Sequence, residues 1–376
     1  MEKLIYLDHA ATTPVDKRVL EKMLPYFSLS YGNPSSIYTI GRKNKRAIEE
    51  ARNIVASNIG AKQKEIYFTS CGSESDNLAL KGIAYANKNK GNHIITSKIE
   101  HPAILNTCKT LEKQGFEITY LNVDTKGFIR LDELENSIKK DTILISIMFA
   151  NNEIGTIQPI EQIGKIAKKN NIYIHTDAVQ TVGNIKIDVK KLGIDLLSMS
   201  AHKFYGPKGV GALYVRNGID FERIQDGGHQ EKGKRSGTEN VAGIVGLAEA
   251  LKLANLNLEE NNLKILNNRN YFIDRLKEDI NNIQINGDLD NRLPGNINIS
   301  LEGIDSLEVL LKLDEYGICA SAGSAGSSGD GAPSYVLTSI GLSNRKANGS
   351  LRFSLGKDNT KQEIDYTIKI LKELII

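Results

Sequence analysis

The sequence is poor in the residues that build disulfide or metal frameworks, and it has no tryptophan. It contains three cysteines among 376 residues, at irregular spacing and without a CxxC or Cys/His cluster. We therefore expect neither disulfides nor a structural metal site. The N-terminal stretch MEKLIYLDHAATTP lacks an apolar run long enough for a signal peptide, and no later stretch approaches a membrane span. These absences predict a cytoplasmic protein with no membrane partner.

Basic and acidic residues are nearly balanced in number. Lysine and arginine number 48 against 45 acidic residues, which gives a net charge of +3, and the basic residues are scattered along the chain. We therefore expect no nucleic-acid partner. Hydrophobic residues make up 40% of the chain, an ordinary share for a globular protein with one large domain and one smaller domain. Small-molecule chemistry is the function class that remains.

Short apolar runs alternate with amphipathic stretches of helical period, which is the rhythm of repeated β-α units. The apolar runs are EIYFTS, HIITSK, FEITYL, TILISIMF, IYIHTDA, LLSMSAHK and GVGALYV. They predict an α/β fold whose mainly parallel sheet is covered by helices on both faces. We expect a large domain over 14–251 and a smaller α+β domain formed by 1–13 and 252–376. A long polar helical stretch over about 240–279 is expected to lead from the large domain into the smaller one.

Polar residues follow several of these runs, at the strand ends where open parallel sheets bind ligands. Gly72 and Ser73 lie between a strand and a helix, so their amides and hydroxyl suit a phosphate, although a helix cap is the alternative. Asp177 ends a strand and can keep a pyridinium nitrogen protonated, or it can simply cap that end. Lys203 can form an imine with an aldehyde, whereas a lone loop lysine is normally solvated. The order of these three features is that of fold-type I pyridoxal-phosphate (PLP) enzymes.

At these motifs the chain resembles the cysteine desulfurases of the NifS/IscS type, which are class V aminotransferase-family, fold-type I PLP enzymes. The resemblance covers nearly the whole chain and is carried by YLDHAATTP, YGNPSS, EIYFTSCGSESDNLALKG, HIITSKIEH, NNEIGTIQPI, HTDAVQ, SAHKFYGPKGVGALYVR, RSGTEN, PSYVL and LRFSLG. It implies PLP as cofactor and L-cysteine or a close analogue as substrate. It also implies a homodimer with shared active sites, a sulfur-acceptor protein and a role in iron–sulfur cluster assembly.

The resemblance also implies a role for each site residue. Lys203 would carry the cofactor as a Schiff base, and His101 would stack on the ring and move protons. Arg352 would bind the substrate carboxylate, with help from Asn33, and Thr238 would reach the phosphate of the neighbouring subunit. Seven further positions would hold the cofactor: Gly72, Ser73, Asn152, Asp177, Gln180, Ser200 and His202. Gly72, Ser73, Ser200 and His202 would lie at the phosphate. Asp177 would lie at the ring nitrogen, and the amides of Asn152 and Gln180 would lie at the ring oxygen.

The resemblance fails at the nucleophile. The family's loop reads Gly-Ser-Ala-Cys, and the segment ASAGSAGSSG here places Gly326 at the cysteine position. A glycine has no thiolate, so the persulfide-forming attack cannot occur there. Cys319, near a strand end seven residues upstream, could replace it only if local strand pairing were dismantled. Segment 226–234 also departs from the family pattern, which favours a naturally divergent paralogue over an engineered single change.

Three hypotheses follow from these departures. The first is a desulfurase-family protein that binds L-cysteine, with its sulfur transfer impaired or altered by Gly326. The second is a PLP-dependent β-elimination C–S lyase, which gives pyruvate, ammonia and a thiol without needing an enzyme thiol. The third is a non-catalytic PLP-binding paralogue, and the retention of Lys203, His101, Asp177 and Arg352 argues against it. Alanine as product indicates the first hypothesis, and pyruvate indicates the second.

Overall fold

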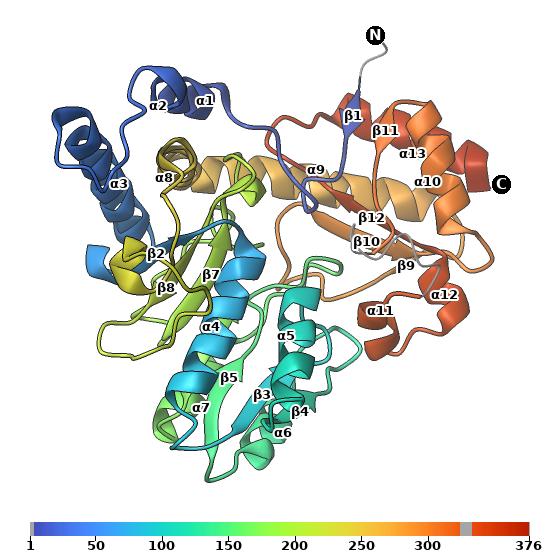
Figure 1. The fold of residues 1–376 in the computed structure, drawn as a ribbon. Helices are drawn as coiled ribbons and strands as arrows, with labels where there is room; N and C mark the ends of the chain where they lie inside the picture. The colour runs from blue at the N-terminus through green and yellow to red at the C-terminus, as the bar shows by residue number, and fades with distance from the viewer. Residues whose placement is uncertain (1–3, 324–332, 376) are drawn as a thin grey trace.

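The apolar runs form a seven-stranded sheet in the order β2-β8-β7-β6-β5-β3-β4 (Figure 1). The structure, a computed structural model, describes residues 4–323 and 333–375. Five neighbouring strands pair in parallel, and β8 runs antiparallel to both β7 and β2. The mainly parallel sheet is therefore confirmed, with one reversed strand. The strands are β2 Ile66–Thr69, β3 His93–Ser97, β4 Glu117–Leu121, β5 Thr142–Ser146, β6 Tyr173–Asp177, β7 Leu196–Ser200 and β8 Gly211–Val215.

Helices cover both faces of this sheet, as a sheet of fully buried strands requires. Every residue of β3, β5, β7 and β8 is buried. One face packs against α4 Gly72–Ala86 and α5 Pro102–Glu112, through side chains such as Leu80 and Ile104. The other face packs in one core with side chains of α1 Lys17–Met23, α3 Thr39–Asn58, α6 Leu131–Ser137, α7 Ile160–Lys169 and α8 Val241–Leu256. The short helix α2 Pro25–Ser28 follows α1.

A second hydrophobic core forms around the C-terminal third of the chain. Its strands are the antiparallel set β9 Gln284–Ile285, β10 Asn296–Ser300 and β12 Ser350–Ser354, and the parallel pair β1 Ile5–Tyr6 and β11 Ile318–Cys319. Its helices are α9 Leu258–Asp279, α10 Ser306–Glu315 and α13 Lys361–Ile375, with α11 Tyr335–Ser339 and α12 Asn344–Asn348 nearby. Ile5 and Leu7 belong to this core, so the N-terminal segment is part of it. The domain boundaries themselves stay a prediction.

The helical stretch expected over 240–279 is confirmed, but its polar character is wrong for the first half. The segment forms two helices, α8 and α9, which are bent by 72° at the break between them. Most of α8 is buried, because it packs between α1, α3 and the sheet and so needs apolar residues on all sides. Within the described residues no single helix is long and apolar enough to cross a membrane, although α8 and α9 together meet that test by length and composition.

Candidate active site

The candidate site lies where several strands of the central sheet end. Asp177 is the last residue of β6, and Ser200 is the last residue of β7. Gly72 begins α4 shortly after β2, and His101 immediately precedes α5 after β3. Because these strands run in the same direction, their carboxyl ends meet along one edge of the sheet, which is where ligands bind in open α/β sheets.

Lys203 ends a short 3-10 turn that follows β7 directly. Its Nζ donates to the carbonyl oxygens of Ala10 and Ala11, at 2.5 and 2.8 Å, and both belong to the N-terminal segment. Burial, helped by the nearby positive charge of Arg352, lowers the pKa of this ammonium to about 8, although Asp177 and Asp8 act in the opposite direction. A buried lysine held only by carbonyls can lose its proton near neutral pH, as imine chemistry requires.

Asp177 presents a buried carboxyl at the end of β6, and its Oδ1 accepts from the backbone N–H of Val179 at 2.9 Å. Burial raises its pKa, while the neighbouring His101 and Lys203 pull that pKa down. A buried carboxylate is stabilised most by an adjacent cation. The position therefore suits a protonated ring nitrogen.

Beneath Asp177 lies a buried polar group that sequence reasoning missed. His175 Nδ1 is 2.8 Å from Ser146 Oγ, and its Nε2 is 3.0 Å from Ser198 Oγ. Burial lowers the pKa of this histidine to about 3, so it stays neutral. The Asp76 carboxyl, 3.7 Å from His175 Nε2, is fully buried, and burial together with the charge of Asp177 raises its pKa well above the ordinary value. The alternation of β6 could have indicated His175, but the place of Asp76 depends on how α4 packs.

The first turn of α4 forms a cradle for an anion. The side chain of the N-cap residue, Cys71, makes no hydrogen bond to the first amides of the helix, and such amides are available to an anion. A Cβ added to Gly72 would lie 2.6 Å from Val179 Cγ2 and 3.6 Å from Ser200 Cβ, so the turn packs against the ends of β6 and β7. Ser73 stands one residue further along the helix. The structure thus places the predicted phosphate residues of β7 and α4 side by side.

Three of the remaining predicted residues have defined partners. His101 Nδ1 accepts from the backbone N–H of Ala103 at 3.1 Å, which leaves Nε2 to carry the proton, and burial lowers the pKa of the ring. His202 Nδ1 lies 3.1 Å from a threonine hydroxyl, Thr12 Oγ1, and burial lowers the His202 pKa to about 4. Gln180 Nε2 donates at 3.0 Å to the same Ala10 carbonyl that holds the lysine. The N-terminal segment is therefore a wall of the site.

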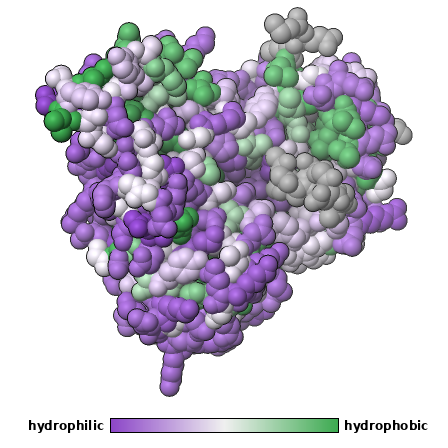
Figure 2. All heavy atoms as spheres, viewed as in Figure 1, coloured by the Kyte–Doolittle hydropathy of each residue, from purple (hydrophilic) through white to green (hydrophobic). Residues whose placement is uncertain are grey.

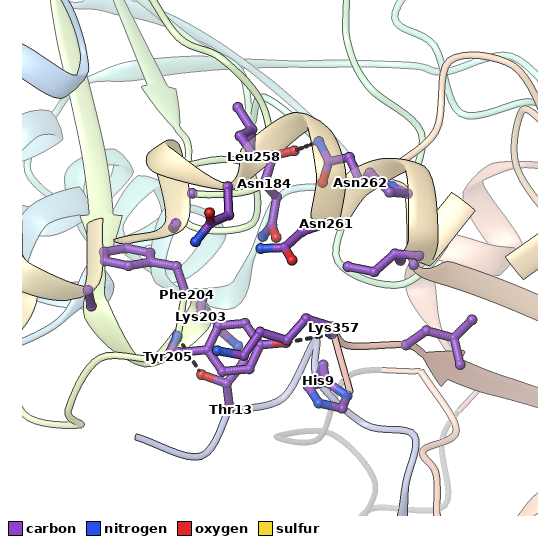
Figure 3. A pocket seen from close by; sticks show the side chains of 18 of the residues that line it. His9, Thr13, Asn184, Lys203, Phe204, Tyr205, Leu258, Asn261, Asn262 and Lys357 are labelled. Carbon is purple, nitrogen blue, oxygen red and sulfur yellow. Dashed lines mark hydrogen bonds between the residues drawn. The ribbon is translucent and has the colours of Figure 1, made fainter. Parts of the chain in front are cut away.

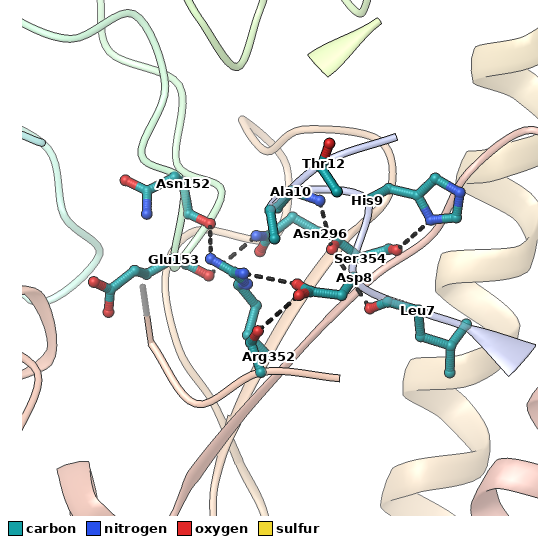
Figure 4. A network of polar contacts seen from close by, with 12 residues as sticks. Leu7, Asp8, His9, Ala10, Thr12, Asn152, Glu153, Asn296, Arg352 and Ser354 are labelled. Carbon is teal, nitrogen blue, oxygen red and sulfur yellow. Dashed lines mark hydrogen bonds and ion pairs between the residues drawn. The ribbon is translucent and has the colours of Figure 1, made fainter. Parts of the chain in front are cut away.

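Arg352 lies on β12, in the second core, and its side chain is 1% exposed. Its Nη1 donates to the backbone carbonyl of Asn152 at 3.2 Å, and its Nη2 pairs with Asp8 Oδ1 at 2.8 Å (Figure 4). Asp8 was not predicted as a site residue, because nothing near it in the sequence indicates an arginine 344 residues away. Asn152 contacts the site here through its carbonyl rather than its amide.

Within the described part of the chain, two predicted residues, Asn33 and Thr238, have no hydrogen bond or ion pair with this group, and a third is not described. Asn33 is exposed, and its Oδ1 accepts from Ser35 N in its own loop at 2.9 Å. Thr238 is exposed in the loop before α8. Gly326 lies outside the described residues. Their assigned roles stay predictions.

A cavity of about 260 Å³ borders Lys203 on the side of the α8–α9 bend (Figure 3). Its walls come from the N-terminal segment, the two helices and residues 354–358, and they include Tyr205 and Asn261. Neither Asp177 nor His101 belongs to these walls. The cavity therefore borders Lys203 but not Asp177 or His101. The strand-end residues, rather than this cavity, define the candidate active site.

The residues present fit the cofactor that the resemblance implies. The uncapped N-terminus of α4 beside Ser200 suits a phosphate, and the buried Asp177 suits a ring cation. Lys203 has a lowered pKa and lies within electrostatic reach of Asp177 and Arg352. Together these groups can hold a phosphorylated pyridine aldehyde and an amino acid next to it.

Comparison with known proteins gives matches along nearly the whole chain. The aminotransferase class-V family model matches residues 5–367. Cysteine desulfurase IscS of Clostridium botulinum (strain Hall) is 54% identical over 377 residues, covering 100% of this chain and 95% of its own length. A NifS-like protein of known structure has a TM-score of 0.94 at 41% identity, covering 99% of both chains. SspA in complex with cysteine has a TM-score of 0.83 at 40% identity, covering 95% of this chain and 100% of its own.

Proposed function

The chain belongs to the aminotransferase class-V family, and from this premise we propose that it acts on the C–S bond of L-cysteine or a close analogue. Its relatives are PLP-dependent cysteine desulfurases, and the chain is a member of that family. The observation that carries the proposal is that the N-terminal segment brings Lys203 and Arg352 together, through Ala10 and Asp8, with Asp177 within electrostatic reach of the lysine. These are the groups that an amino-acid-processing PLP enzyme needs for the imine, the ring nitrogen and the substrate carboxylate.

When bound, PLP supplies an electron-withdrawing ring that weakens the bonds at the α- and β-carbons of an amino acid. The chain's own residues supply the rest. Lys203, with its pKa near 8, can take up and return a proton close to neutral pH. His101 offers a second proton carrier at Nε2, because its Nδ1 is engaged by Ala103. Arg352 fixes the substrate by its carboxylate, which holds the reacting carbons in place.

Sulfur transfer requires a thiolate that this sequence does not place at the expected position. In desulfuration the C–S bond breaks, the sulfur atom passes to a thiolate as a persulfide, and the β-carbon keeps the electron pair and gains a proton to give alanine. Gly326 offers no thiolate. The chain therefore binds and activates L-cysteine but completes desulfuration poorly, unless a thiol of another molecule, such as a sulfur-acceptor protein, takes the sulfur.

A β-elimination lyase is the second candidate, and Gly326 favours it, because elimination needs no enzyme thiol. Segment 226–234 carries less weight. Its Glu231 carboxylate pairs with the buried Arg52 at 2.6 and 2.8 Å, and Glu231 and Lys232 adopt positive φ, at 45° and 59°. The family pattern also has Glu at this position, so the ion pair by itself indicates no change of reaction.

Product analysis distinguishes these reactions. We expect the purified, PLP-loaded protein to bind L-cysteine and to release little alanine, with an increase when a small dithiol is added as sulfur acceptor. Pyruvate, ammonia and sulfide in equal amounts, with no dependence on the dithiol, would contradict the proposal and support the lyase. A protein that neither binds L-cysteine nor forms any product would indicate the non-catalytic paralogue.

The surface around α1 and α2 supports a homodimer. Five apolar side chains there are between 54% and 87% exposed: Leu24, Phe27, Leu29, Tyr31 and Ile37. Figure 2 shows hydrophobic side chains gathered over these helices at the top of the molecule. Exposed apolar side chains gathered in one region often mark a protein interface, and a second copy of this chain is the partner that the family implies.

A charge placed in this patch should separate the subunits. We expect Phe27→Asp to weaken dimerisation by about tenfold or more, because burying an unpaired carboxylate costs several kcal/mol. Leu311→Asp on α10, where the parent side chain is 62% exposed, is the matched control and should leave the dimer intact. Sedimentation of both variants measures the effect. A monomeric parent protein that retains PLP at full occupancy would contradict the shared site.

Thr238→Ala tests the shared site separately. The variant should retain PLP less tightly while its subunits stay associated.

A further inference from the structure

Asp8 pairs with the same guanidinium that the proposed function assigns to the substrate carboxylate. Its Oδ1 pairs with Arg352 Nη2 at 2.8 Å, and its Oδ2 accepts from the Ser321 hydroxyl at 2.8 Å (Figure 4). The side chain of Asp8 is 14% exposed, whereas that of Arg352 is 1% exposed. A carboxylate supplied by the protein itself therefore covers the guanidinium on the side of the candidate site.

The guanidinium is not fully satisfied by this arrangement. Its Nη1 reaches only the Asn152 carbonyl at 3.2 Å, and its Nε is buried with no hydrogen-bond partner among the described residues. A buried guanidinium is most stable when one carboxylate accepts from two of its N–H groups in a bidentate pair. An unpaired N–H in a buried site raises the free energy of the folded state. Asp8 offers Arg352 only its Oδ1, because its Oδ2 accepts a hydrogen bond from the Ser321 hydroxyl.

The backbone holds Asp8 in this place. Ser354 N donates to Leu7 O at 2.7 Å, and His9 N donates to Ser354 O at 3.2 Å, so Asp8 is pinned beside β12. Ser321 is pinned to the same strand, because its N–H and C=O pair with the backbone of Arg352 at 3.1 and 2.6 Å. The carboxylate, hydroxyl and guanidinium thus form a preformed set rather than a chance surface contact.

We propose that Asp8 is a specificity-determining residue that competes with the substrate α-carboxylate for Arg352. The inference rests on the proposed function, since it takes Arg352 as the substrate's carboxylate site. Two carboxylates share one buried guanidinium, so binding of the second must overcome the pairing of the first. Without substrate, the positive charge of Arg352 is therefore neutralised by the protein's own Asp8 carboxylate. Only a ligand with additional contacts, such as an amino acid joined to the cofactor, displaces Asp8.

The test compares two ligands that lack a β-sulfur and so cannot be desulfurated. L-Alanine carries the α-carboxylate, and L-alaninamide is its neutral counterpart. Dissociation constants for both are measured by calorimetry on the PLP-loaded protein and on its Asp8→Asn variant, which keeps the shape of the side chain but removes its charge. Because the variant leaves the Arg352 charge uncompensated, L-alanine should bind about tenfold tighter, and L-alaninamide should be unchanged.

Each other outcome overturns the proposal. Weaker L-alanine binding by Asp8→Asn would show that Asp8 only positions Arg352, and equal changes for the two ligands would show an effect of shape. Ser321→Ala keeps the Asp8 charge and frees its second oxygen to pair with Arg352. It should therefore strengthen the competition, so that L-alanine binds more weakly and L-alaninamide is unchanged, and it serves if Asp8→Asn does not fold. Arg352→Ala tests the proposed function separately. If it leaves the preference for L-alanine intact, the carboxylate is held elsewhere and the proposed function fails.

Discussion

Borohydride reduction of the purified protein is expected to fix PLP covalently to Lys203, and Lys203→Ala is expected to abolish that label. The reason is that Lys203 is a buried amine beside a strand end, with backbone carbonyls of Ala10 and Ala11 as its hydrogen-bond partners. Loss of this amine also removes a proton carrier, which typically costs about 10²–10⁴-fold in rate. Peptide mass mapping locates the label. Lys208 follows five residues later and is exposed, so Lys208→Ala is the control and should label normally.

The pH at which the apoprotein takes up PLP is a second readout of the same residue. Burial lowers the Lys203 pKa from the ordinary 10.5 to about 8, so the reactive neutral amine gains population as the pH rises through about 8. Uptake should therefore rise with pH over that range and level off above it. A midpoint near 10, as for a solvated lysine, or a label found on Lys208, would show that Lys203 is not the attachment site.

Gly326→Cys is expected to convert a protein that releases little alanine from L-cysteine into an active desulfurase. The groups predicted to bind and activate the substrate are present, so the thiolate is the missing component. The variant should release alanine at least about a hundredfold faster, a factor that corresponds to roughly 2.7 kcal/mol of transition-state stabilisation. It should also leave a persulfide on residue 326. Alanine quantification and mass spectrometry of the trapped persulfide measure both effects.

Ser327→Cys is the matched control for this conversion, because it supplies the same thiol one residue along the chain. It should release much less alanine than Gly326→Cys, since the thiolate has to meet the substrate sulfur. A Gly326→Cys protein that binds L-cysteine but makes neither alanine nor persulfide would show that more than the nucleophile has changed. The differences from the family pattern in segment 226–234 would then explain the missing desulfurase activity. The β-elimination lyase would become the better-supported function.

Local sequence patterns predicted the parts of the site that depend on strand ends. Asp177 and Ser200 close β6 and β7 as the apolar runs indicated, and Lys203 follows at the expected turn. Such positions are readable because hydrophobic period and strand length are local properties of the chain. The helix over 240–279 shows the limit. Its helical character was correct, but the burial of α8 and the bend before α9 follow from packing against helices far away in the sequence.

The sequence by itself determined the parallel sheet, the strand-end positions of Lys203 and Asp177, and the absence of a cysteine at residue 326. Only the tertiary structure decided that Asp8 pairs with Arg352, and that carbonyl groups of the N-terminal segment accept hydrogen bonds from Lys203. The physical reason is the range of the interactions. A strand or turn is stabilised by neighbours along the chain, whereas the Asp8–Arg352 pair joins residues 344 apart and exists only after β12 and the N-terminal segment lie side by side in the second core.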